Sequence, residues 1–384
     1  MSRVAIKREV LRWAMDRSGL TIDDLRRKFP RARQWDAGES QPTLRQLEAI
    51  ARLTLTPLGF FFLAEPPQEP LPVPYFRTLG DERPSGPSPD LLETLQVMQQ
   101  RQAWMREYLI EQGQQALSFV RSAKPRESCA SVAERIRRTM GLDEGWAAQK
   151  LTWTDALRAL RGAAEGAGIL VVVNGIVGNN THRKLSPSEF RGFVLVDEYA
   201  PLVFINGADG KAAQMFTLAH ELVHVVFGSS AAFDLREMQP ADDPTEQACN
   251  RVAAEFLVPE RELRRIWPSV KRDTQPFNTI ARWFKVSAIV AARRALDLDL
   301  VPKAAFLDFY HVYQSEERQA AATKSEGGDF YANQNLRLGR TFASAVIQAA
   351  TEGKLLYADA YKLTGLYGKS FDRYAADLKI RGLR

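Results

Sequence analysis

Cysteine and histidine are scarce in this chain of 384 residues, which contains two cysteines and four histidines. Cys129 and Cys249 are too few and too far apart for a disulfide framework or for a zinc site built from cysteine alone. A reducing compartment, the cytoplasm, is therefore the simplest expectation. Long hydrophobic runs are also missing, and the first twenty residues are too charged for a signal peptide. We expect no membrane partner.

A strong charge of either sign is absent as well. Lysine and arginine number 52 against 46 aspartates and glutamates, which gives a net charge of +6. Such a balance permits a nucleic-acid partner without requiring one. Hydrophobic residues at 45% and charged residues at 26% are typical of a globular protein. The length predicts two to four domains rather than one core.

Two of the four histidines lie in one five-residue string, His220-Glu221-Leu222-Val223-His224. On the helix predicted for residues 216–228, His220 and His224 share a face, so both imidazoles can bind one metal ion. Glu221 lies beside them, where it can accept a proton from a water that the ion activates. The arrangement is that of a zinc hydrolase, and we predict one Zn²⁺ per chain, with manganese or iron as lesser options.

A catalytic zinc ion needs a third protein ligand and one open position. Glu246 is the favoured third ligand because it opens the helix predicted for residues 245–257 and is held rigidly there. Asn250 lies one turn later on the same face, where its side chain can hydrogen-bond the outer nitrogen of a ligand histidine. Asp242 and Asp243 are rival candidates, but both precede Pro244 in an irregular stretch. Glu255 is a third rival, and it lies on the opposite face of the helix from Glu246.

Three short, β-branched apolar runs precede the histidine string, at residues 169–173, 193–196 and 202–205. They predict a small sheet directly before the metal-binding helix and therefore an α+β fold in a multi-domain chain. An extended peptide substrate can add to the edge of such a sheet. Val203, Phe204 and Ile205 form the candidate substrate-edge strand, and a buried central strand is an equal alternative.

Helical periodicity and a proline-rich stretch divide the rest of the chain. The C-terminal part predicts three helices, and its residues indicate no chemistry. The helix-turn-helix shape before it is better explained by packing than by contacts with bases. The predicted parts are a helical domain (1–63), a proline-rich linker (64–90), a helical connector (91–150), the metal-binding core (151–270), the helix-turn-helix-like segment (271–302) and the C-terminal region (303–384).

In the helical domain, residues 34–39 read Gln-Trp-Asp-Ala-Gly-Glu and residues 41–44 read Gln-Pro-Thr-Leu. They resemble the end of the recognition helix and the loop after it in Xre-type helix-turn-helix domains. The segment between Thr21 and Trp35 is about four residues shorter than the family pattern, which removes about one helical turn. DNA is therefore one candidate partner of this domain, and protein docking or a structural role is the favoured alternative.

A resemblance to a known family rests on residues 191–193, 201–206, 216–224, 246–250 and 254–259. With these motifs the core resembles the ImmA/IrrE family of metallopeptidases over roughly residues 150–300. The resemblance implies a gluzincin-like endopeptidase that cleaves a partner protein, an Xre-type repressor or antitoxin, and so regulates transcription in a stress response or a mobile element. Two alternatives are a DNA-binding regulator whose zinc site is a sensor or a relic, and a toxin of an Xre-linked pair. Glu221 distinguishes a peptidase from a sensor, because a sensor needs ligands but no general base.

Overall fold

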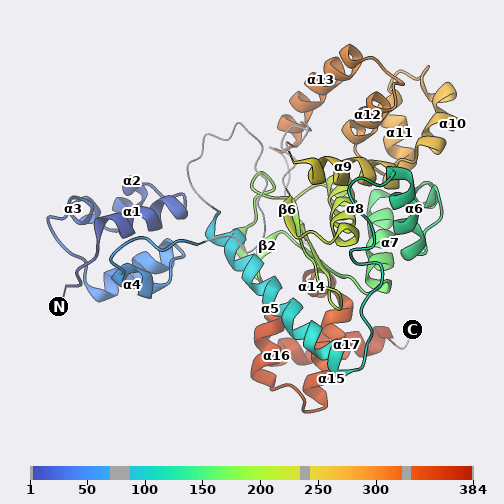
Figure 1. Ribbon diagram of the computed structural model, residues 1–384. Coiled ribbons are helices and arrows are strands. Elements are labelled where there is room, and N and C mark those ends of the chain that lie inside the picture. The colour runs from blue at the N-terminus through green and yellow to red at the C-terminus, as the bar shows by residue number, and fades with distance from the viewer. Residues whose placement is uncertain (1–2, 70–86, 234–242, 322–329, 383–384) are drawn as a thin grey trace. The chain divides into compact units, whose positions relative to one another are not determined.

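The computed structural model describes residues 3–69, 87–233, 243–321 and 330–382 (Figure 1). The chain forms two compact units, one of residues 1–72 and 79–96 and one of residues 73–78 and 97–384. The division falls within the long helix α5 (Pro89–Glu111). Among the described residues, no helix combines the length and the apolar composition that a membrane crossing requires.

The first unit is a small helical domain with its own apolar core, to which Leu11, Leu47 and Phe61 contribute. The capping box predicted from Thr21 and Asp24 is present at the start of α2. Helix α3, which contains the residues predicted to end a recognition helix, has only six residues. The elements of this unit are α1 (Arg8–Arg17), α2 (Ile22–Lys28), α3 (Ala32–Ala37), α4 (Leu44–Leu53) and η1 (Leu58–Phe62).

A four-stranded sheet lies at the centre of the second unit, with strand order β1-β5-β4-β6. Strands β1 and β5 are parallel and buried along their whole length, whereas β4 runs antiparallel to both of its neighbours. A separate two-stranded ribbon joins β2 and β3. The strands are β1 (Leu170–Asn174), β2 (Ile176–Val177), β3 (Asn180–Lys184), β4 (Gly192–Leu195), β5 (Leu202–Asn206) and β6 (Ala231–Phe233).

This strand order corrects the prediction of the substrate-edge strand. Val203, Phe204 and Ile205 lie in β5, which hydrogen-bonds to β1 on one side and to β4 on the other. Because both of its edges are already paired, β5 cannot accept a further strand. The alternative of a buried central strand is the one observed. Within the described part of the chain, β6 lies at an edge of the sheet and pairs only with β4.

Helices cover this sheet, and α8 (Lys211–Phe227) contacts β4 and β5 directly (Figure 1). Helix α8 is apolar on nearly all sides and buried, as expected of a helix between other layers. Gly228 ends it in the left-handed conformation, with φ of 81°. Its neighbour on the other side is α9 (Pro244–Leu257). The remaining helices of this part are α6 (Cys129–Thr139), η2 (Trp146–Gln149), α7 (Trp153–Gly166), α10 (Glu260–Val270), α11 (Pro276–Phe284), α12 (Ala288–Asp297) and α13 (Lys303–Ala321).

The C-terminal region contains more helices than the three predicted from the sequence. After α13, the described residues form α14 (Phe330–Leu338), α15 (Arg340–Thr351), α16 (Tyr357–Thr364) and α17 (Lys369–Gly382). Arg101 of α5 ties this region to the rest of the unit, because its guanidinium donates to the carbonyl oxygens of Leu363 and Arg337 at 2.9 Å. Burial lowers the pKa of Arg101 to about 10.

The α+β class predicted from the sequence is confirmed, with a small sheet and helical ends. All three predicted strands are present as β1, β4 and β5. Ser287 caps α12, whose Val290, Ala291 and Ala295 are buried in the main core. That burial agrees with a packing role for the helix-turn-helix-like segment.

Candidate metal centre

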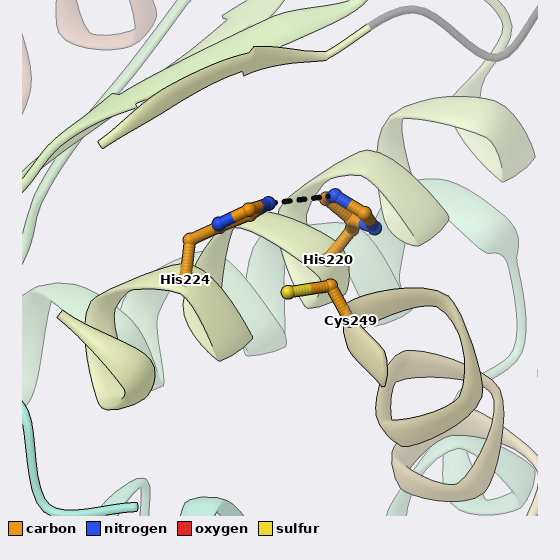
Figure 2. A group of neighbouring side chains, drawn as sticks. All are labelled: His220, His224 and Cys249. Carbon is orange, nitrogen blue, oxygen red and sulfur yellow. Dashed lines mark hydrogen bonds between the residues drawn. The ribbon is translucent and has the colours of Figure 1, made fainter. Parts of the chain in front are cut away.

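Helix α8 brings the two histidines of the sequence motif together. Their spacing of four residues places both imidazoles on one face of the helix, as Figure 2 shows. The Nε2 atoms of His220 and His224 lie 3.0 Å apart, and both side chains are buried. Two ring nitrogens at this distance cannot both carry a proton without repulsion, so at least one presents a lone pair to the space between them.

Helix α9 adds Glu246 to the pair. Its Oε2 atom lies 3.1 Å from Nε2 of His220, and its Oε1 atom lies 3.1 Å from Nε2 of His224. Asp243 caps this helix, because its Oδ1 atom accepts hydrogen bonds from the backbone N–H groups of Thr245 and Glu246. Asp243 therefore orients the turn that carries Glu246 and does not compete with it. Asp242, the other rival in this stretch, lies outside the described residues.

These separations fit a single zinc ion. Nitrogen and oxygen ligands lie about 2.0–2.1 Å from zinc, and tetrahedral angles then place two ligand atoms roughly 3.3 Å apart. The distances that link the two histidines and Glu246 are 3.0–3.1 Å. Two imidazoles and one carboxylate are also the ligand types that zinc prefers.

A hydrogen bond holds the outer nitrogen of each imidazole. Oδ1 of Asn250 lies 3.1 Å from Nδ1 of His220, and Oγ of Ser229 lies 2.9 Å from Nδ1 of His224. With Nδ1–H donating outward, each ring presents the Nε2 lone pair toward Glu246. The structure thus places Asn250 where the sequence predicted it. Ser229 was missed, although its place directly after the helix-ending Gly228 is visible in the sequence.

The charges of the site suit metal binding. Burial lowers the pKa of His220 to about 4, which keeps this imidazole neutral near pH 7. Burial by itself raises the pKa of Glu246, but interactions with His220 and His224 outweigh burial and hold that pKa below its ordinary value. The imidazole of His220 is therefore neutral and the carboxylate of Glu246 is ionised, and these are the forms in which the two groups bind a metal ion.

Glu221 is buried beside these residues, and within the described part of the chain neither of its carboxylate oxygens has a hydrogen-bond partner. Burial raises the pKa of Glu221 well above its ordinary value, and the negative charge of Glu246 raises it further. Buried polar groups are almost always paired, so an unpaired carboxylate beside a ligand cluster marks a functional group.

Residues 164–296 match the IrrE N-terminal-like domain of the peptidase M78 family. The match supports a metallopeptidase of the ImmA/IrrE type and includes α8, α9 and the four-stranded sheet. Residues 338–377 match a family described as a domain of unknown function (DUF8813). No curated protein matches the chain.

Cys249 is a further residue near the two histidines that sequence reasoning missed. One ring nitrogen of His220, one of His224 and Sγ of Cys249 all lie within 4.8 Å of one another, and all three side chains are buried (Figure 2). Burial raises the pKa of the Cys249 thiol well above its ordinary value. The clue in the sequence is its position three residues after Glu246, which puts both on one side of a helix. Glu246 makes the closer approach, at 3.1 Å from each histidine.

Glu255, the remaining rival for third ligand, is occupied elsewhere. Its carboxylate forms a buried ion pair with Arg294 and accepts a hydrogen bond from the backbone N–H of Glu260. Arg294 also donates to the carbonyl oxygen of Val258, so this ion pair fixes the end of α9 against α12. Glu255 therefore has a structural role at the junction of α9 and α12.

Proposed function

We propose that the core, residues 151–270, is a zinc-dependent endopeptidase that hydrolyses a peptide bond in a specific partner protein. The observation that carries this proposal is the convergence of His220, His224 and Glu246 at 3.0–3.1 Å beside the unpaired carboxylate of Glu221. A sensor or relic site has no need of such a carboxylate. An Xre-type repressor or antitoxin is the proposed substrate, because the resemblance of residues 1–63 and of the core points to that pairing.

Each side chain has a distinct role in this proposal. A zinc ion held by His220, His224 and Glu246 supplies Lewis-acid polarisation of the peptide carbonyl and lowers the pKa of water toward ~7. Glu221 accepts the proton of the attacking water and passes it to the leaving amine. Asn250 and Ser229 keep both imidazoles in the tautomer and orientation that binding requires.

The proposed third ligand is Glu246 rather than Cys249, and cobalt distinguishes them. A thiolate ligand gives Co²⁺ an intense charge-transfer absorption in the near ultraviolet, which a carboxylate does not. We expect no such band in the cobalt-loaded protein, and we expect Glu246→Ala to lose most of its metal affinity. Arg251→Ala, an exposed change on the same helix, is the matched control and should bind cobalt normally. A thiolate band that disappears in Cys249→Ala would assign the third position to sulfur.

A peptide substrate needs an edge of backbone to pair with, and β6 replaces β5 in that role. Strand β6 follows α8 in the chain and, among the described strands, pairs only with β4. Its other edge is therefore where an extended peptide can add main-chain hydrogen bonds. His220, Glu221 and His224 are buried, so a substrate reaches them only when neighbouring residues move.

The test is cleavage of a small Xre-type repressor, chosen as the candidate substrate if a gene for one lies beside the gene of this protein. The full-length protein, loaded with Zn²⁺, is incubated with that repressor, and the products are identified by mass spectrometry. We expect one cut that Glu221→Gln abolishes while its metal content stays unchanged, because the amide cannot accept the proton. Cleavage by Glu221→Gln would show that the base is elsewhere. A metal-loaded wild type that leaves the repressor intact would contradict this substrate and favour the sensor alternative.

A further inference from the structure

Helices α15, α16 and α17 form a small three-helix bundle beside α5 (Figure 1). A four-residue turn, residues 365–368, joins α16 to α17. Its two glycines adopt positive φ, 68° at Gly365 and 49° at Gly368, which allows the chain to reverse sharply between the helices. Helix α15 packs against both of the others. A first helix that covers two helices joined by a tight turn is the arrangement of a helix-turn-helix domain.

Aromatic packing fixes the angle between α16 and α17. The ring of Phe371 lies 5.3 Å from that of Tyr361 and 6.1 Å from that of Tyr357, measured between ring centroids. Phe371 and Tyr374 of α17 are buried. The two helices are therefore held as one rigid unit, as a DNA-reading helix must be.

Basic charge is concentrated at the two ends of the chain. Residues 338–384 contain eight lysines and arginines and four aspartates and glutamates, a net charge of +4. Residues 1–62 contain twelve and seven, a net charge of +5, so the 275 residues between them carry −3 of the total of +6. Both end regions thus carry a net positive charge, whereas the residues between them carry a net negative charge. This distribution indicates a polyanionic partner at the ends.

The first turns of α17 present exposed cations. Lys369 and Arg373 are exposed and, within the described part of the chain, have no ion-pair partner. Lys369, Arg373 and Ala376 are spaced along one face, and the small side chains of Ser370 and Ala376 leave room for close approach. Acidic groups nearby are Asp372, which is exposed on α17, Asp377, which lies four residues after Arg373 on the same helix, and Asp359, which lies 3.4 Å from Lys362.

The corresponding helix of the N-terminal unit is less suited to DNA. Helix α3 has six residues, whereas α17 has fourteen. Its Arg33 pairs with Asp23 at 2.9 Å, and its Asp36 pairs with Arg12 at 2.6 Å. The cations of that face are therefore partly neutralised within the domain, in contrast to Lys369 and Arg373.

We propose that α16 and α17 form a DNA-binding helix-turn-helix that binds double-stranded DNA with α17 in the major groove. Lys369 and Arg373 contact phosphates and base edges from the first turns of α17, which is where such helices make their contacts. Tyr367, 65% exposed in the turn, lies beside the adjacent phosphate backbone. The function is additional to peptide hydrolysis, and it would hold the peptidase on the DNA where a repressor is bound.

The experiment measures binding of the full-length protein to a fluorescent DNA duplex of random sequence by anisotropy, at several salt concentrations. The double variant Lys369→Ala/Arg373→Ala should bind the duplex about tenfold more weakly. Its affinity should also fall less steeply with salt, because two lost phosphate contacts reduce the steepness of log affinity against log salt by about 1.8. The matched control is Arg138→Ala/Arg158→Ala, which removes the same charge from exposed positions on α6 and α7. It should leave both affinity and slope near the wild-type values.

Both double variants change exposed side chains, so their melting curves should match the wild type and show that folding is intact. Selection from a pool of random duplexes should also enrich a sequence motif with the wild type and lose it with Arg373→Ala. An equal loss of DNA affinity in the two double variants would show that the effect depends only on net charge, and it would overturn the proposal. Unchanged binding by Lys369→Ala/Arg373→Ala, or preference for a single strand over the duplex, would overturn it as well.

Discussion

Gly192 of β4 is the position where one added methyl group should disturb the candidate metal site most. Its backbone lies against α8, and a Cβ atom built there would be 2.6 Å from Cγ2 of Thr217 and 2.8 Å from the carbonyl oxygen of Phe204. The same Cβ would lie 3.4 Å from Oε1 of Glu221. Gly192→Ala therefore tests whether the sheet and the metal-binding helix are in the contact that the structure shows.

The magnitude follows from these distances. Carbon atoms in contact lie about 3.5–4.0 Å apart, so the substitution forces a separation of about 1 Å between buried elements. One of the obstructing atoms is backbone of a central strand and cannot rotate away. Overpacking of this kind costs about 1–3 kcal/mol, and we expect the upper part of that range. Since α8 carries His220, Glu221 and His224, a shift of this size should also slow cleavage by roughly a hundredfold.

Two measurements check the prediction, namely calorimetric melting of the full-length protein and competition for zinc with a chelating dye. Gly192→Ala should melt earlier and bind zinc more weakly. Adding Thr217→Ser removes the nearest obstructing methyl group and should recover part of both losses. Gly162→Ala is the matched control, because a Cβ at this position of α7 would meet no atom within 4 Å. It should be slightly stabilising.

The reasoning fails if Gly192→Ala melts and binds zinc like the wild type. It also fails if Thr217→Ser recovers nothing, because the obstruction would then lie elsewhere.

Four further predictions concern the metal site, the ion pair of Glu255 and the N-terminal unit. His220→Ala should abolish the binding of close to one divalent ion per chain, and an unchanged metal content by atomic absorption would refute the site. Ser229→Ala should weaken zinc binding by roughly tenfold or more through loss of the bond to His224, as the same dye competition would show. Glu255→Ala leaves Arg294 buried and unpaired and should cost about 3–5 kcal/mol by melting, yet the folded fraction should still bind one ion. Residues 1–62 alone should bind DNA weakly and lose it as salt rises, whereas tight, salt-resistant binding to one operator by gel shift would contradict the reading of α3.

The sequence by itself determined the elements that depend on local spacing. His220 and His224, four residues apart, share a helical face whatever surrounds them, and the same geometry relates Glu246 to Asn250. The capping pair of Thr21 and Asp24 and the three apolar strands are equally local. Such features need only the repeat of a helix or a strand, which a single sequence displays.

Tertiary structure alone decided which elements meet. The order of strands in the sheet depends on pairing between segments far apart in the chain, and for that reason β5 could not be assigned to the centre or to the edge from its own composition. The hydrogen bond of Ser229 to His224, the proximity of Cys249 to the histidines and the fit of Gly192 against α8 likewise depend on how separate elements pack. A polar residue in a turn or a glycine in a strand has many ordinary explanations in a sequence. The distances between residues of α8, α9 and β4 show which explanation applies to each residue here. They depend on contacts between segments far apart in the chain, which the local repeat of a helix or a strand does not encode.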